Sequence, residues 1–213
     1  MDYMEWEPIY REILEDFGFV REENERAARI LAEVIKGREI DLKELEGIIR
    51  GRNVLICGDA PTLQEELRSI TASDFKIIAA DGATSTILRE GMIPDVIVTD
   101  LDGSLGDIIY ANRMGSLVVV LGHGDNIDAV RKVVPNLSRV LGTTHGPPFG
   151  SIYNFGGFTD GDRAVFLAKE LGASQITLVG FDFEDKTVDE RKQRKLRWAK
   201  RLIDQLLSER RRG

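Results

Sequence analysis

Three aspartates stand directly after apolar runs that are typical of buried strands. Asp81 follows KIIAA, and Asp100 and Asp102 follow VIVT with one residue between them. In an extended segment, residues two apart lie on the same side of the pleat, so Asp100 and Asp102 can hold one ion between them while that geometry lasts. Carboxylates a few ångströms apart repel each other, and a hard divalent cation such as Mg2+ removes the repulsion. The alternative is that Asp and Gly only form turns here, as they commonly do.

A fourth candidate oxygen ligand lies in LGHGDNIDAVRK, which follows the apolar run LVVVL. We expect Asp125 at the same edge as the other carboxylates, with His123 near bound phosphates. The alternative is that Asp125 or Asn126 only caps the helix that follows. A zinc site is disfavoured, because the other histidine of the chain, His145, lies in a distant loop.

Aromatic residues are concentrated in the Gly-rich segment GTTHGPPFGSIYNFGGFTDGD. A loop this long is uncommon unless it has a function. The rings that can stack on a flat ligand, or can instead fix the loop to the core, are Phe149, Tyr153, Phe155 and Phe158. At the end of the segment, Thr159 and Asp162 have capping-box spacing, with Asp in place of the usual Glu.

The segment CGDAPTLQEEL is a further candidate for phosphate binding. Its pattern predicts a strand, a turn at Gly58 and a helix, with Thr62 and Glu65 at capping-box spacing. The N-terminus of such a helix can accept a phosphate. The segment has neither a GxGxxG motif nor a P-loop lysine, so the motif alone does not assign a nucleotide.

The elements that position these residues are predicted from the period of the apolar pattern. Residues 1–50 carry two helical stripes, which end near Gly18 and Gly37, so we expect a helical N-terminal appendage. Residues 51–213 then contain short runs rich in Val and Ile: NVLIC, KIIAA, DVIVT, LVVVL, SRVLG and QITLVG. Such runs predict an α/β domain with a mostly parallel, Rossmann-like sheet flanked by helices and ending in an amphipathic helix. Ligands of these sheets bind at the carboxyl ends of the strands.

Composition restricts the kinds of partner. The 213 residues are 42% hydrophobic and 31% charged, which suits a folded globule. The formal net charge of −7 argues against nucleic acid, and an anionic ligand then needs an added cation. Cys57 is the single cysteine, so neither a disulfide nor a cysteine-rich zinc site is possible within the chain. With no leader-like segment and no apolar run of membrane length, we expect a cytoplasmic protein without a membrane partner, and a homodimer is one possible assembly.

The longer motifs resemble those of a known superfamily. ADGATSTILREGMIPDVIVTDLDGS resembles the signature of the thiamin pyrophosphokinase-like superfamily, in which an ADGA turn, a strand opened by PD and a D-x-D pair line a magnesium and nucleotide site. HGDN, FTDGDRAVFLAKELGA and LVGFDF are similar to a narrower branch, the archaeal 6-hydroxymethyl-7,8-dihydropterin pyrophosphokinases of the MptE-like family. The likeness covers roughly residues 50–200, in order and spacing.

The resemblance implies Mg2+-dependent transfer of diphosphate from ATP to a pterin alcohol, 6-hydroxymethyl-7,8-dihydropterin, with release of AMP, in pterin cofactor biosynthesis (tetrahydromethanopterin or folate). It implies that Asp100 and Asp102 are catalytic metal anchors, with Asp81 and Asp125 completing the site directly or through water. The nucleotide-binding residues that we predict are Gly58, Asp81, Gly82, His123, Asn126 and Arg163. The acceptor-binding residues that we predict are Asn154, Phe158, Asp160 and Asp182.

For Arg163 and for a basic run near the C-terminus, both a phosphate-binding role and a surface position are alternatives. Arg163 can meet a phosphate or can lie on the surface. A basic run near the C-terminus can form a solvated helix face, or one or two of its members can reach the triphosphate: Arg191, Lys192, Arg194, Lys195 and Arg197.

Three other functions remain as alternatives. Thiamin pyrophosphokinases have a β-domain that completes the thiamin site, whereas this chain has no C-terminal run of strands, and HGDN replaces their acidic, threonine-bearing motif. TDLDGS also resembles the opening motif of haloacid dehalogenase-like phosphatases. That motif normally sits on the first strand of its domain and needs a lysine and another acidic pair downstream, whereas here two predicted strands precede it and the downstream partners are not evident. A non-catalytic nucleotide sensor would have little use for so many carboxylates. Turnover with ATP and Mg2+ separates these alternatives.

Overall fold

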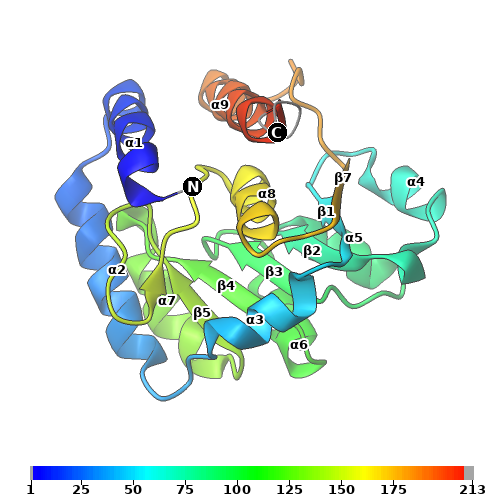
Figure 1. The fold of residues 1–213 in the computed structure, drawn as a ribbon, viewed down its shortest axis with the longest axis horizontal. Coiled ribbons are helices and arrows are strands. Elements are labelled where there is room, and N and C mark those ends of the chain that lie inside the picture. The colour runs from blue at the N-terminus through cyan, green and yellow to red at the C-terminus, as the bar shows by residue number, and fades with distance from the viewer. Residues whose placement is uncertain (1, 209–213) are drawn as a thin grey trace.

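The structure is a computed structural model that describes residues 2–208. At its centre is a parallel seven-stranded sheet in the order β6-β5-β4-β3-β2-β1-β7 (Figure 1). The strands are β1 Asn53–Cys57, β2 Lys76–Ala80, β3 Val96–Thr99, β4 Leu117–Leu121, β5 Val140–Thr143, β6 Ile152–Tyr153 and β7 Gln175–Val179. All six predicted strands and the parallel sheet are confirmed. The two-residue β6 was not predicted, because it is too short to give an apolar run.

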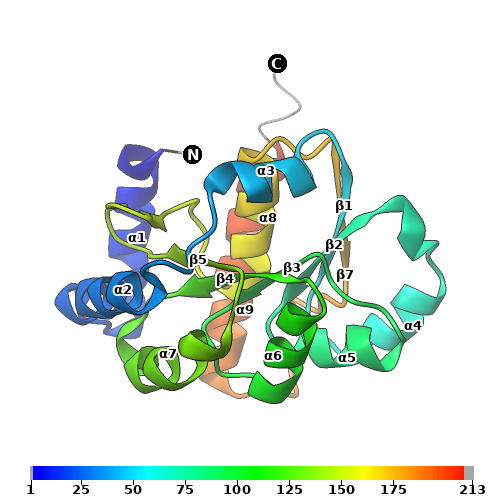
Figure 2. The same cartoon turned by 90° about the horizontal axis from the view of Figure 1, so that it is seen from below.

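Helices cover both faces of the sheet. From β1 to β5 each new strand is added on the same edge, through α4 Leu63–Arg68, α5 Ala83–Arg89, α6 Leu105–Arg113 and α7 Ile127–Val133. The chain then returns through α8 Asp160–Glu170 to β7 on the other edge. Because parallel crossovers are right-handed, this reversal of direction places α8 on the opposite face. Figure 2 shows α8 above the sheet and α5, α6 and α7 below it.

The two predicted capping boxes have different outcomes. The box at the start of α8 is present, with the Thr159 N–H donating to Asp162 Oδ1 at 2.8 Å. The box at the start of α4 is absent, since Thr62 makes no side-chain cap hydrogen bond. Thr62 has a helical backbone, with φ −74° and ψ −16°, whereas an N-cap residue normally has an extended one.

Three helices make up the N-terminal part: α1 Tyr3–Phe17, α2 Arg21–Ile35 and α3 Leu42–Ile49. Gly18 ends α1 in the left-handed conformation, with φ 66°. The buried side chains of α1 and α3 join the apolar core on the α8 face, and those of α2 join the core on the other face. The Trp6 indole N–H also donates to His145 O at 2.9 Å. The helices therefore share both cores with the sheet, while the domain boundary at residue 50 stays a prediction.

The predicted amphipathic helix is α9 Glu190–Ser208, which packs on α8; the residues after Ser208 lie outside the described range. Polar contacts also join α9 to α1. Arg194 Nη2 donates to Asp16 Oδ1 at 2.7 Å, and the Trp198 indole N–H donates to Asp16 Oδ2 at 2.8 Å. Arg201 forms an ion pair of 3.0 Å with Glu12. Within residues 2–208, no helix combines the length and the apolar character required to cross a membrane.

Candidate active site

The carboxyl ends of the strands open into a cavity of about 670 Å³. Its walls come from the segments that follow β1, β2, β3, β4, β5 and β7, and from α9. Cavities that bind cofactors and small substrates have volumes in this range. The cavity lies at the edge of the sheet where the sequence predicts ligand binding.

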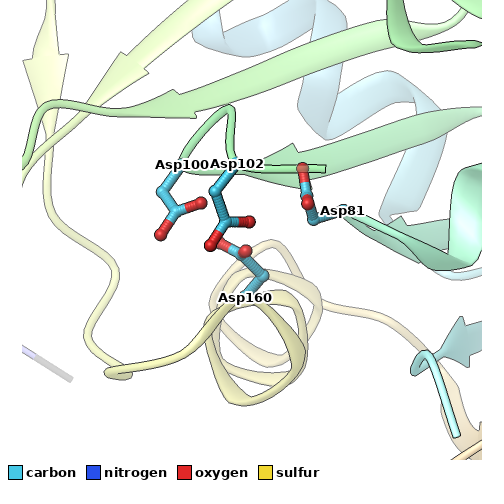
Figure 3. A group of neighbouring side chains, drawn as sticks. All are labelled: Asp81, Asp100, Asp102 and Asp160. Atoms are coloured by element: carbon cyan, nitrogen blue, oxygen red, sulfur yellow. The ribbon is translucent and has the colours of Figure 1, made fainter. Parts of the chain in front are cut away.

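Four carboxylates meet in this cavity: Asp81 after β2, Asp100 and Asp102 after β3, and Asp160 at the first position of α8 (Figure 3). One oxygen of each carboxylate lies within 4.8 Å of one oxygen of every other. Asp160, which we expected to bind the acceptor, thus joins the three aspartates expected to bind metal. Asp125 lines the cavity outside this group of four, and its side chain is 79% exposed. We call the four residues Asp81, Asp100, Asp102 and Asp160 the acidic cluster.

A turn, and not the pleat of β3, orients Asp100 and Asp102. The strand ends at Thr99, and Leu101 has a left-handed backbone with φ 70°, so the expected extended geometry stops before the second aspartate. Leu101 is buried, and its N–H donates to Thr99 Oγ1 at 2.7 Å. Asp81 also has a positive φ, of 34°. Left-handed backbone is uncommon in residues other than glycine, and such strained positions are concentrated at functional sites.

Two neighbours fix the Asp81 carboxylate. The Thr99 hydroxyl donates to Asp81 Oδ1, and the Asp81 N–H donates to Val98 O at 2.8 Å, in continuation of the ladder between β2 and β3. A Cβ at Gly103 would overlap Asp81 Oδ2. The glycine of the DLDGS motif therefore leaves room for a carboxylate from the neighbouring strand.

Burial and mutual repulsion destabilise the charged form of the acidic cluster. Burial and the nearby Asp102 raise the pKa of Asp81 to about 7. Burial and the charge of Asp102 raise the pKa of Asp100 to about 6. Burial and the charge of Asp100 raise the pKa of Asp160 well above its ordinary value. Within residues 2–208, Asp100 Oδ1 is buried and has no hydrogen-bond partner, so this set of oxygen ligands fits a hard cation such as Mg2+.

Arg163 supports the acidic cluster from inside the protein. It is only 5% exposed, so the surface position that was one alternative is wrong. Arg163 Nη1 donates to Asp160 Oδ1 at 2.7 Å, and Nη2 donates to Thr143 Oγ1 at 2.6 Å. Arg163 is not among the residues that line the cavity. It therefore positions Asp160, and its contact with a phosphate stays a prediction.

Most of the other predicted residues line the cavity. They are Gly58, Gly82, His123, Asn126, Phe158 and Asp182. Asn126 connects two of the walls, because its Nδ2 donates to Asp100 O at 2.6 Å and to Leu121 O at 2.7 Å. Asn154 does not line the cavity. Its Nδ2 donates to two carbonyls of its own loop, at 2.9 and 2.8 Å, so it stabilises the loop.

The aromatic residues of the same loop also differ in whether they line the cavity. Phe158 lines the cavity, whereas Phe149, Tyr153 and Phe155 do not. Tyr153 and Phe155 stack on each other with ring centroids 6.0 Å apart. The contacts of Tyr153 and Phe155 therefore support the alternative in which these rings fix the loop to the core.

Several residues that line the cavity did not appear among the predicted site residues. They are Phe19, Asp59, His145, Phe181 and Phe183. Phe19 lies in the link between α1 and α2, and its ring centroid is 5.1 Å from that of His123. Burial lowers the pKa of His123, which favours the neutral ring. No motif in the sequence places the α1–α2 link near the sheet edge, so Phe19 could not be identified as a site residue from the sequence.

Three members of the predicted basic run also line the cavity, namely Arg191, Lys192 and Lys195 of α9. Arg191 and Lys195 are four residues apart and therefore lie on one face of the helix. The same face continues into Leu196 and Ala199, which also line the cavity. Arg194 and Arg197 do not line the cavity, and Arg194 instead contacts Asp16 of α1.

Comparison with known proteins gives the family. The family model for the MptE-like 6-hydroxymethylpterin diphosphokinases matches residues 28–187. The 6-hydroxymethyl-7,8-dihydropterin pyrophosphokinase of Methanothermobacter thermautotrophicus is 42% identical over 97% of this chain and 95% of its own length. The proteins of the same name from Pyrococcus furiosus and Methanocaldococcus jannaschii are 43% and 41% identical, over 97% of this chain and 94% and 96% of their own lengths. This chain therefore belongs to the MptE-like family of 6-hydroxymethylpterin diphosphokinases.

Proposed function

We propose that the protein transfers the terminal diphosphate of ATP to the hydroxyl group of 6-hydroxymethyl-7,8-dihydropterin and releases AMP. Membership of the family and the names of the three archaeal relatives support this reaction. The observation that carries the proposal is that one cavity brings the acidic cluster together with the cations of α9. Such a cavity can hold a complex of a metal ion with a triphosphate.

The acidic cluster is the part of the cavity that suits Mg2+. Asp81, Asp100, Asp102 and Asp160 would hold the ion, and the buried, unpartnered Asp100 Oδ1 supports this assignment. When bound, Mg2+ offsets the negative charge of phosphate oxygens and helps to orient them. Asp125 is close enough to the same cavity to act through water.

The cations of α9 suit the phosphates. Arg191, Lys192 and Lys195 line the cavity, and none of the three forms an ion pair within residues 2–208. The remainder of the protein carries excess negative charge, so these side chains give the cavity a local positive wall. Their charge is therefore available for the phosphates of ATP.

In this reaction the hydroxymethyl oxygen forms a bond to the β-phosphorus. The bond between that phosphorus and the oxygen that bridges to the α-phosphorus breaks, and AMP keeps the bridging oxygen with its electron pair. The hydroxyl group loses its proton as its oxygen becomes esterified. The residues of the chain bind and align the two substrates, which is the main way in which proteins accelerate phosphoryl transfer.

Release of AMP in the presence of ATP and Mg2+ tests the proposal. We expect AMP in proportion to added 6-hydroxymethyl-7,8-dihydropterin, and negligible AMP with thiamin at the same concentration. A site that pairs the donors and acceptors of one ring can reject a ring that lacks them by roughly 10^4. A thiamin rate equal to the pterin rate would overturn the pterin assignment. Hydrolysis of a phosphomonoester would support the phosphatase alternative, and ATP binding without turnover would support the sensor alternative.

A further inference from the structure

Asp59 follows β1 and lines the cavity. It belongs neither to the acidic cluster nor to the cations of α9 that we propose for phosphate binding. Its side chain is exposed, and it forms no hydrogen bond or ion pair within residues 2–208. Lys192 and Arg89 act on it only through their charge at longer range. Asp59 is thus a carboxylate that faces the cavity with its acceptor oxygens available.

The other carboxylates at this end of the cavity have local partners. Asp182 Oδ1 accepts from the Glu184 N–H at 3.0 Å. Asp185 Oδ1 accepts from the N–H and the hydroxyl of Thr187, at 2.7 and 2.6 Å. These two carboxylates stabilise the turns after β7, and Asp59 does not have such a role.

The Asp59 carboxylate lies against the backbone of the ADGA turn. A Cβ at Gly82 would overlap Asp59 Oδ2, so the carboxylate rests against the residue that follows Asp81. Because consecutive Cα atoms are about 3.8 Å apart, the carboxylates of Asp59 and Asp81 are separated by on the order of 10 Å or less. A two-ring heterocycle with a hydroxymethyl arm can bridge that distance.

An aromatic wall stands beside Asp59. A Cβ at Gly58 would lie 3.1 Å from Phe181 Cδ2, and a Cβ at Gly161 would lie 2.8 Å from Phe181 Cε1. Phe181 therefore packs closely against the backbone of the β1 loop and the first turn of α8. The ring of Phe183 lies 5.5 Å from that of Phe181, centroid to centroid, and both rings line the cavity. A flat ligand at this end would have an aromatic wall on one side.

We propose that Asp59 is a specificity residue that binds the aminopyrimidinone edge of the pterin, with Phe181 and Phe183 beside the ring. This edge carries two adjacent donors, the ring N3–H and the 2-amino group, which match the two oxygens of one carboxylate. The Watson–Crick edge of adenine instead places an acceptor next to a donor, and the triphosphate is itself anionic. The carboxylate therefore favours the pterin at this end and directs ATP toward the cations of α9. This inference rests on the proposed function.

Asp59→Asn is the direct test, with Asp185→Asn as the matched control at the same end of the cavity. We expect Asp59→Asn to raise KM for 6-hydroxymethyl-7,8-dihydropterin roughly 10- to 100-fold, the effect of losing hydrogen bonds to a charged group. KM for ATP should change by less than about twofold. The control should leave both constants near those of the wild type, because Asp185 has local partners.

A substrate analogue that lacks the 2-amino group separates recognition from a structural effect. The wild type should bind the analogue more weakly than the natural acceptor, whereas Asp59→Asn should bind the two with similar affinity. Equal discrimination by both proteins would overturn the role of Asp59. Absence of pterin-dependent AMP release in the wild type would instead contradict the proposed function, so the two failures are distinguishable.

Discussion

Arg163 and Asp160 form an ion pair in which Nη1 and Oδ1 are 2.7 Å apart and the side chains are 5% and 17% exposed. The other terminal nitrogen of the guanidinium group, Nη2, donates to Thr143 Oγ1. This contact fixes the orientation of the Arg163 side chain. Asp160 faces the cavity at its other side. The pair therefore links the interior of the fold to the proposed metal site.

Removal of the arginine should destabilise the protein. Arg163→Met leaves the partly buried Asp160 without its cation, and we expect a loss of up to about 3–5 kcal/mol in the free energy of unfolding. Adding Asp160→Asn should restore part of this loss, because the uncompensated charge is then gone. Urea denaturation at pH 8 measures both effects. Arg201→Met is the control, because its ion pair with Glu12 is exposed and should contribute less than about 1 kcal/mol. Equal losses in the two arginine variants would contradict this interpretation.

The acidic cluster gives a ranking among candidate metal ligands. Asp100→Asn, Asp102→Asn and Asp160→Asn should each weaken Mg2+ binding about tenfold or more, with turnover reduced most at limiting Mg2+. Asp125→Asn should have a smaller effect, since Asp125 lies outside the group of four. Titration of AMP release with Mg2+ measures the ranking. A larger loss in Asp125→Asn than in Asp160→Asn would make Asp125 the direct ligand.

The acidic cluster also makes the stability of the metal-free protein dependent on pH. The pKa values of Asp81 and Asp100 in the folded chain, about 7 and about 6, lie above the ordinary value of 3.8. The folded state therefore keeps protons that the unfolded state has released. The stabilisation from these groups is full below the ordinary pKa and is lost as the pH rises through 6 and 7. We expect Tm in EDTA to fall over this window.

Added Mg2+ should reverse that trend. Binding requires deprotonated carboxylates, so the rise in Tm on adding Mg2+ should increase from about pH 5 to about pH 7.5. Asp81→Asn should raise Tm in EDTA at pH 7.5 and should reduce the response to Mg2+. Thermal unfolding in EDTA and in Mg2+ at each pH is the measurement. A response to Mg2+ of the same size at both pH values would argue against the acidic cluster as the binding site.

Two glycines that are three residues apart provide a test of packing at the DLDGS motif. Gly103→Ala places a methyl group where the Asp81 carboxylate lies, so we expect Mg2+ affinity to fall about tenfold or more. Gly106→Ala is the control. It has no atom within 4 Å of the added Cβ and lies in α6, where alanine is favoured over glycine by about 0.5–1 kcal/mol. Isothermal titration with Mg2+ and thermal unfolding distinguish the two. Unchanged affinity in Gly103→Ala would show that Asp81 can move without cost.

The sheet could be predicted because each of its longer strands is a continuous apolar run. Asp81, Asp100 and Asp102 could be predicted together because each follows such a strand, and parallel strands end at the same edge. The left-handed turn at Leu101 could not be predicted, because leucine rarely adopts that backbone and its side chain gives no signal for it.

Asp160 shows why the members of the acidic cluster could not all be identified without the structure. It comes 58 residues after Asp102 along the chain and is the first residue of a helix, so its sequence context indicates only a helix start. It reaches the other aspartates because the chain reverses direction after β6 and α8 crosses the opposite face of the sheet. The cations of α9 are a similar case, since the position of that helix depends on contacts with α1 and α8.

The attachment of α9 to α1 has a consequence for protein synthesis. The first helix leaves the ribosome early, whereas the cations at Arg191, Lys192 and Lys195 are among the last described residues to emerge. A nascent chain that ends before Glu190 already contains every aspartate of the acidic cluster but not the positive wall of the cavity. The negative half of the site is thus made first, and the site is completed only when the last helix docks beside the first.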